Sequence, residues 1–158
     1  MAGTGCAGGK SEDGFSLRTN YNVTVKGTWA SKNSERHSYR ELIEANVQAW
    51  QGTPGQPFIP VATQGWDRRP WEAPNGEGLG PKGSPVSWYF AGQTPEAFGG
   101  CLERMAQWMD ANPQQATKDR LALVYAWNEI GEGGWLVPCR NDPEGVYLKA
   151  IRRVVFGK

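Results

Sequence analysis

The sequence is poor in the residues that most metal sites and nucleophilic sites require. It has one histidine, His37, and three cysteines that form no CxxC pair. One histidine cannot supply a two-His metal site, and zinc ribbons and dithiol redox motifs need paired cysteines. A Ser/His/Asp triad would have to use His37, which stands in a polar run before a predicted helix and is interpreted as a solvated residue. We therefore expect no metal and no cofactor.

The charge balance and the hydropathy exclude two further classes of partner. The 17 basic and 16 acidic residues leave a formal net charge of +1. This charge is too small to attract a nucleic acid or an anionic membrane. No apolar run approaches the roughly 20 residues of a membrane span, and the first residues lack the apolar core of a signal peptide. The sequence therefore predicts no nucleic-acid partner and no membrane span, and it leaves the compartment open.

Glycine and proline are abundant, with 21 and 11 residues in a chain of 158. This share is well above the average and predicts long loops between few regular elements. Residues 1–14 are small and polar without periodicity, so they are predicted to be a flexible lead-in or a truncation point. Residues 15–158 are long enough to form one domain core.

Strand and helix patterns alternate along the rest of the chain. Apolar and β-branched runs predict strands near residues 15–20, over 57–63 and over 121–127. Helix signals predict a helix from Ser34 or Ser38 to about Gln51, one that opens at Thr94 and ends at Asn112, and a last one that opens at Asp142. Such alternation is typical of parallel βα units with crossover helices, in a barrel or a doubly wound sheet.

The most informative stretch is residues 121–133 (LALVYAWNEIGEG), where an apolar strand ends in Asn128, Glu129 and Glu132. Cleavage of a glycosidic bond needs one carboxylic acid for the leaving oxygen and a second carboxylate as base or nucleophile. Glu129 and Glu132 could form that pair if the two residues between them turn the chain toward one cleft. Taken alone, however, two glutamates after a strand are more often solvated loop residues.

The chain is rich in tryptophan, and several of its eight tryptophans fall in or beside predicted strand-tip loops. A flat apolar face with an N–H donor can stack on a sugar ring, although a tryptophan is more often part of a core. The five tryptophans so placed are Trp66, Trp71, Trp88, Trp127 and Trp135.

Four segments together resemble one family. WNEIGEGGWLVP resembles the WNEW-x-EG signature of glycoside hydrolase family 99-like and WbsX-type proteins. LRTNYNV is similar to the family's strand that ends in Tyr and Asn, PVATQGWDRRPW to its GWD-x-RP segment, and TPEAFGGCLERM to its TPE-x-F helix opening. The segments follow one another in the family's order, and the resemblance extends from about residue 15 to residue 155.

The resemblance implies an α/β fold that is the C-terminal portion of a (β/α)8 TIM-type barrel, with about three βα units and an incomplete barrel. It implies that Glu129 takes a proton from the sugar's own 2-hydroxyl, which gives a 1,2-anhydro intermediate. It implies that Glu132 is the general acid and then the base for water, with retention of configuration. The residues expected to bind substrate are Tyr21, Asn22, Trp66, Asp67, Trp127, Asn128 and Trp135.

The sequence departs from the family pattern at Ile130, where a second Trp is usual, and at Val137, where an acid is usual. An oligosaccharide or polysaccharide is the expected partner, and an oligomer or a missing N-terminal half of the barrel is expected to complete the cleft. Two alternatives remain: a non-catalytic carbohydrate-binding remnant and a polysaccharide-assembly glycosyltransferase of the WbsX type. The departures at Ile130 and Val137 are expected to affect contacts with the sugar and not the two carboxylates.

Overall fold

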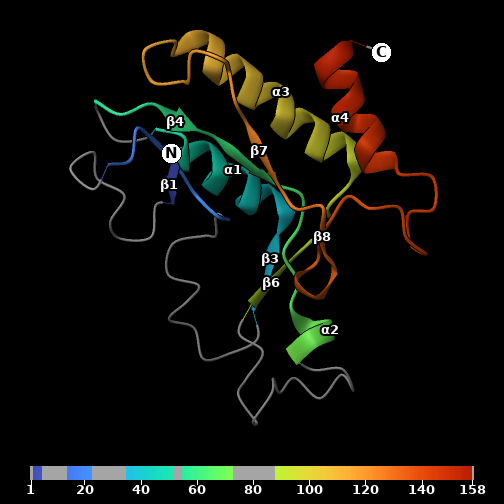
Figure 1. Ribbon diagram of the computed structural model, residues 1–158. Coiled ribbons are helices and arrows are strands. Elements are labelled where there is room, and N and C mark those ends of the chain that lie inside the picture. The colour runs from blue at the N-terminus through green and yellow to red at the C-terminus, as the bar shows by residue number, and fades with distance from the viewer. Residues whose placement is uncertain (1, 5–13, 23–34, 52–54, 73–87, 158) are drawn as a thin grey trace.

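The computed structural model of the chain describes residues 2–4, 14–22, 35–51, 55–72 and 88–157. Figure 1 shows a mixed α/β arrangement in which long helices alternate with short strands. Among the residues in these ranges the strands form no closed barrel. The α/β class is therefore confirmed.

The main strands run parallel and pair largely in chain order. They are β1 (Ala2–Thr4), β2 (Leu17–Thr19), β4 (Phe58–Ile59), β5 (Val61–Thr63) and β7 (Leu123–Tyr125). β2 pairs with β4, and β5 pairs with β7. Only Pro60 separates β4 from β5, so the segment 58–63 pairs with β2 through its first part and with β7 through its second. The connection from β2 to β4 contains a helix, and so does the connection from β5 to β7. The predicted parallel βα units are confirmed. β1 differs from the predicted flexible lead-in because it pairs in parallel with β2.

The first long helix begins at Ser38, one of its two predicted caps, and the second begins at its predicted cap. α1 (Tyr39–Ala49) has Ser38 as its N-cap, and Ser38 and Glu41 satisfy each other's backbone N–H in a capping box. α3 (Pro95–Ala111) begins after Thr94, whose side chain accepts a hydrogen bond from the backbone of Ala97. Both caps use side-chain oxygens for N–H groups that have no partner within the helix.

The last helix, α4 (Val146–Phe156), begins later than the sequence predicts. Asp142 Oδ1 does accept a hydrogen bond from the backbone N–H of Val146, at 2.8 Å. The residue directly before the helix is Gly145, however, which has a left-handed φ of 63°. The segment between Asp142 and Gly145 is therefore a turn, and the predicted start at Asp142 is wrong by several residues.

Several short elements were not predicted from the sequence. β3 (Glu35–Ser38) pairs in parallel with β6 (Trp88–Ala91), and β8 (Asn128–Glu129) pairs with β9 (Gly134–Trp135) as an antiparallel hairpin. The one-turn helix α2 (Arg69–Glu72) follows β5. His37 lies on β3, half-buried against Phe90, rather than in a solvated lead-in.

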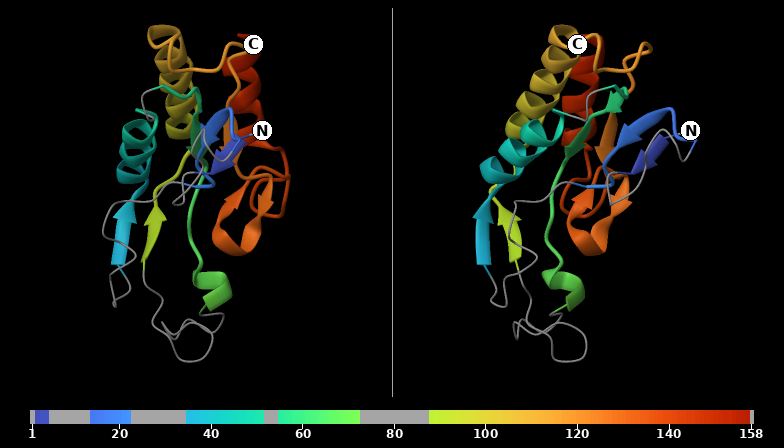
Figure 2. Two further views of the ribbon diagram at one scale, coloured as in Figure 1. Left: turned by 60° about the vertical axis from the view of Figure 1, so that its left-hand side comes forward. Right: turned by 90° about the vertical axis from the view of Figure 1, so that its left-hand side faces the viewer.

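The three long helices lie together on one side of the parallel strands β4, β5 and β7, as Figure 2 shows. α3 packs against both α1 and α4, and α1 and α3 contact β5. All three residues of β5 are buried, which is typical of a central parallel strand. None of the helices among the described residues is long and apolar enough to cross a membrane.

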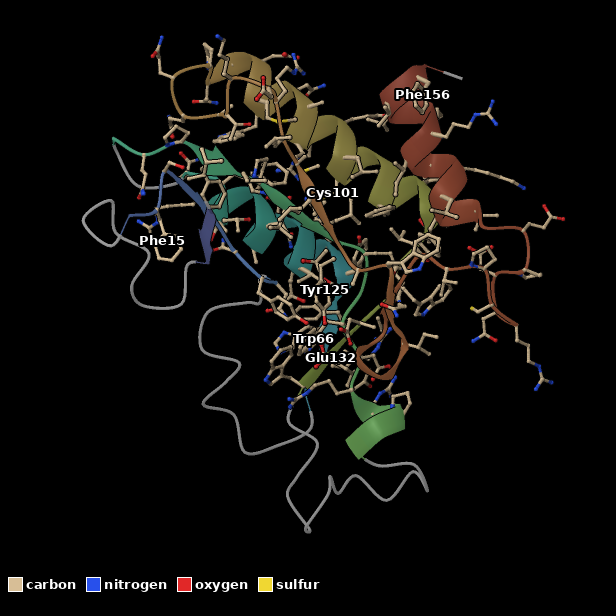
Figure 3. All side chains as sticks on the ribbon, viewed as in Figure 1. Phe15, Trp66, Cys101, Tyr125, Glu132 and Phe156 are labelled. Atoms are coloured by element: carbon tan, nitrogen blue, oxygen red, sulfur yellow. The ribbon has the colours of Figure 1, made fainter. Side chains whose placement is uncertain are left out.

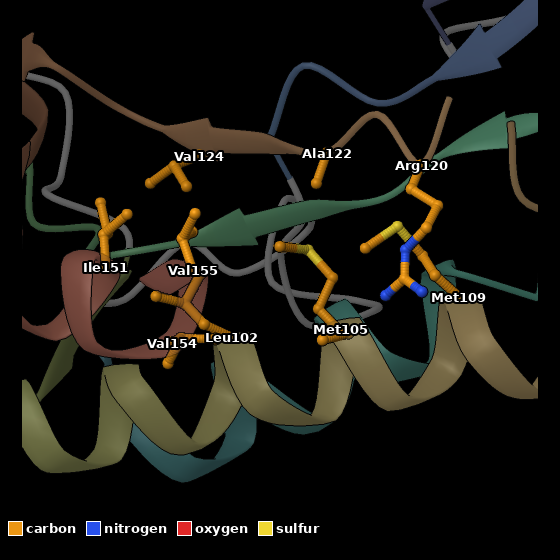
Figure 4. Close-up of a pocket in the computed structure, with 10 residues that line it drawn as sticks. Leu102, Met105, Met109, Arg120, Ala122, Val124, Ile151, Val154 and Val155 are labelled. Atoms are coloured by element: carbon orange, nitrogen blue, oxygen red, sulfur yellow. The ribbon is translucent and has the colours of Figure 1, made fainter. Parts of the chain in front are cut away.

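A cavity of about 430 Å³ lies between the helices and the sheet. Figure 4 shows that Leu102 and Met105 of α3 line it from one side, and Val124 of β7 faces them. Its lining is apolar except for Arg120, and it includes no carboxylate. This cavity belongs to the layer between helices and sheet and not to the side on which Glu129 and Glu132 lie.

Candidate functional site

A second cavity, of about 290 Å³, lies at the carboxyl ends of β2 and β7. Tyr21, Asn128 and Glu129 line it together with Leu123 and Tyr125. Successive side chains of a strand point to opposite faces, so Leu123 and Tyr125 lie on the face opposite to Val124 and the helices. Three of the predicted site residues thus meet at one opening on the free face of the sheet.

The hairpin of β8 and β9 carries the two glutamates. A short 3-10 turn, η4 (Ile130–Glu132), joins the two strands, and Gly133 ends it with a left-handed φ of 72°. Only glycine adopts such a φ without cost. The backbone N–H of Asp67 donates to the Glu132 carbonyl at 2.6 Å. The chain thus turns between the two glutamates, and the turn is fixed to the segment that follows β5.

The hairpin is tied closely to the segment that follows β5. Trp135 N donates to Gln64 Oε1 at 2.9 Å. A Cβ atom added at Gly65 would lie 2.4 Å from the carbonyl oxygen of Gly133. Glycine at position 65 is therefore required for the two backbones to approach so closely.

Tyr125, the last residue of β7, connects the carboxylates to the sheet. Its hydroxyl donates a hydrogen bond to the Glu132 carboxylate, and Figure 3 shows the two side chains next to each other near Trp66. Burial is the main cause that raises the pKa of the Tyr125 hydroxyl. The hydrogen bond to Glu132 and the charge of Glu132 raise it further, and Tyr21 and Glu129 add smaller effects. Tyr125 therefore remains a protonated donor at neutral pH, within electrostatic reach of both glutamates.

Exposed aromatic rings flank this group. Tyr21 packs edge-on against Tyr125, with ring centroids 5.2 Å apart, and is itself 57% exposed. Trp127 is 55% exposed and stands two residues after the end of β7. Such rings beside polar groups are typical of surfaces that bind sugars. Asn22 is half-buried just beyond Tyr21.

Two tryptophans that were predicted to contact substrate, Trp66 and Trp135, pack within the protein. Trp66 is 3% exposed and stacks on Trp88, with centroids 5.4 Å apart. Trp135 packs edge-on against Tyr147 at 5.6 Å. Trp66 and Trp88 therefore belong to the core, so the expectation that their faces are free for a sugar is wrong. The side chain of Trp71 lies outside the described residues.

Asp67, which was expected to bind sugar hydroxyls, forms an ion pair instead. Both of its carboxylate oxygens accept from Arg69, at 2.9 and 2.7 Å, and it also accepts from the backbone N–H of Arg69. The Arg69 guanidinium in turn lies over the ring of Tyr89, 3.5 Å from its centroid. These contacts occupy the Asp67 oxygens and shape the loop after β5.

Two residues of the site, Tyr125 and Gln64, were not predicted. Tyr125 was counted only as part of an apolar strand, and Gln64 as the first residue of a loop. The missed signal is a polar group in an apolar run: Tyr125 has the one hydroxyl of the run 121–127, and both glutamates follow it within seven residues. A hydroxyl at the last buried position of a strand is thus placed to meet the acids that follow.

No group of three His, Cys, Asp or Glu residues in the part of the chain that the structure describes could hold a metal ion. Comparison of the chain with protein-family models, with curated proteins and with solved structures gives no match. The family resemblance of the sequence motifs therefore remains an expectation.

Proposed function

We propose that the chain is a glycoside hydrolase-like domain that cleaves glycosidic bonds in a mannose-containing or related polysaccharide, with Glu129 and Glu132 as the catalytic pair. The observation that carries this proposal is that the Tyr125 hydroxyl, at the carboxyl end of a parallel strand, bonds the Glu132 carboxylate, while Glu129, three residues earlier in the chain, lines the open cavity there. Enzymes built from parallel βα units keep their chemistry at that end of the strands.

The sheet supports the finer proposal that these units are part of a TIM-type barrel. Strands that follow one another in the βα order pair in parallel, and their helices cover one face only. In such a barrel the helices lie outside and the free face of the strands points inward. The cavity beside Glu129 lies on that free face.

The proposed reaction follows the roles that the resemblance implies. Glu129 takes the proton of the sugar 2-hydroxyl, whose oxygen attacks the anomeric carbon while Glu132 protonates the departing glycosidic oxygen. Water then opens the 1,2-anhydro ring at the anomeric carbon and gives a proton to Glu132, while Glu129 returns its proton to the 2-oxygen. Two inversions at one carbon give net retention, without a covalent bond to the enzyme.

Hydrolysis is tested by incubating the purified chain with a mannan and with a set of p-nitrophenyl glycosides. The proposal predicts release of reducing ends or of nitrophenol that depends on enzyme concentration and needs no nucleotide-sugar donor. A chain that binds an oligosaccharide but releases no product from any of these probes would contradict the hydrolase proposal.

A second candidate function is carbohydrate binding without catalysis, which the exposed ring of Trp127 favours. Stacking on this ring supports binding in either case, so Trp127→Ala is expected to weaken the affinity for a mannose oligosaccharide about tenfold. Isothermal titration calorimetry measures this loss. Phe156→Ala is the matched control because Phe156 is also an exposed aromatic, 70% accessible, at the far end of α4. Equal affinities of the two variants would remove Trp127 from the binding surface.

A further inference from the structure

The two carboxylates of the proposed pair are held in different ways. Glu132 accepts a hydrogen bond from Tyr125, and its backbone carbonyl is bonded to Asp67. Glu129 lines the cavity, and within the described ranges no side chain donates to its carboxylate. One acid is therefore fixed by the protein, whereas the other faces the space that a substrate would occupy.

Tyr125 is itself held firmly, as a residue that orients another must be. It is 4% exposed, its carbonyl accepts from Gln64 N at 2.7 Å, and β7 pairs it with Thr63. Its ring also fits closely over the hairpin, because a Cβ atom added at Gly134 would lie 2.8 Å from Tyr125 Cε1. The hydroxyl thus has a defined position with respect to Glu132.

We propose that Tyr125 is a positioning residue for catalysis, whose hydroxyl fixes the Glu132 carboxylate in the orientation in which it exchanges a proton with the glycosidic oxygen. This inference rests on the proposed function and adds to it a residue that the family resemblance does not assign. Tyr125 acts through Glu132 and touches no reacting atom in this arrangement.

Fixing the carboxylate matters because proton transfer depends steeply on geometry. A general acid that is held near its productive orientation loses less entropy in the transition state, and small misplacements of catalytic groups reduce rates strongly. The raised pKa of the Tyr125 hydroxyl keeps this donor protonated across the pH range in which hydrolases work. Tyr125 therefore remains a hydrogen-bond donor to Glu132 throughout turnover.

Tyr125→Phe removes the hydroxyl and keeps the ring. It is expected to lower kcat about 10- to 100-fold on the probe glycoside and to leave KM within about twofold, because the hydrogen bond that orients Glu132 is lost without loss of substrate contacts. Tyr39→Phe is the matched control, since the Tyr39 hydroxyl also makes a buried hydrogen bond, to the Thr63 carbonyl at 2.9 Å, away from the glutamates. The control is expected to lose similar stability and to keep its kcat.

A second measurement does not depend on turnover. In protein labelled with carboxyl-13C glutamate, the Glu132 signal is identified by its absence in Glu132→Gln, and Tyr125→Phe is expected to shift it while the Glu129 signal moves less. An unshifted Glu132 signal, a wild-type kcat in Tyr125→Phe, or a melting temperature far below that of Tyr39→Phe would overturn the proposal. A shifted signal in a chain that hydrolyses no probe would confirm the hydrogen bond, but it would overturn both the catalytic role of Tyr125 and the proposed function.

Discussion

Glu132→Gln and Glu129→Gln are each expected to lower kcat by about 10²- to 10⁴-fold, the usual contribution of a positioned general acid or base. Glutamine keeps the shape of the side chain but cannot exchange the proton. Substrate affinity, measured by calorimetry, is expected to change by less than about threefold, because the aromatic contacts remain. The loss would thus fall on the chemical step and not on binding.

Glu144→Gln provides the control for these two variants. Glu144 is a surface carboxylate in the loop before α4, where it pairs with Lys149 at 3.0 Å. Its replacement is expected to leave both kcat and affinity unchanged. Full activity in Glu129→Gln and in Glu132→Gln would contradict the assignment of the catalytic pair, whereas loss of binding in both would show that they only contact substrate.

Gly65→Ala is expected to destabilise the fold by about 2–3 kcal/mol, through steric conflict in a packed region. The new Cβ would lie 2.4 Å from the Gly133 carbonyl oxygen, and both partners in this contact are backbone. Neither can turn away as a flexible side chain could. The hairpin would therefore have to move away from the segment after β5, and the bond from Trp135 to Gln64 would be strained or lost. Chemical denaturation measures the difference in unfolding free energy.

Gly100→Ala tests whether this effect is specific to position 65. Gly100 lies within α3, and nothing lies within 4 Å of a Cβ atom added there. Alanine at this helical site is expected to stabilise the protein by about 0.5–1 kcal/mol, because it restricts the unfolded chain. An equal, small effect of both substitutions would contradict the close approach of Gly65 to the hairpin.

The elements that the sequence predicted well are those with strong local signals. α3 has a side-chain cap at Thr94, which predicted its first residue, and α1 begins after Ser38, one of the two caps that its sequence offered. β3 was missed because ERHS has no apolar alternation and depends on pairing with β6. The start of α4 was misplaced because Gly145 allows a left-handed turn between the capping Asp142 and the helix.

The candidate site was predicted in part. The strand that ends in acids was visible in the sequence, and the cavity beside Glu129 and Asn128 lies where the carboxyl end of that strand was expected. The role of each tryptophan was less predictable, since a tryptophan side chain can pack in a core or stack on a sugar ring. Trp66 is buried by stacking on Trp88, a residue far along the chain, and among the tryptophans whose side chains the structure describes only Trp127 is well exposed.

The central claim is that Glu129 and Glu132 hydrolyse a glycoside with retention of configuration. Proton NMR of the first product that the wild-type chain releases from an aryl α-mannoside or a mannan oligosaccharide tests it most directly. The account predicts that the α-anomer forms first and later mutarotates, and that Glu132→Gln forms no product on the same time scale. Initial formation of the β-anomer, or undiminished hydrolysis by Glu132→Gln, would contradict it.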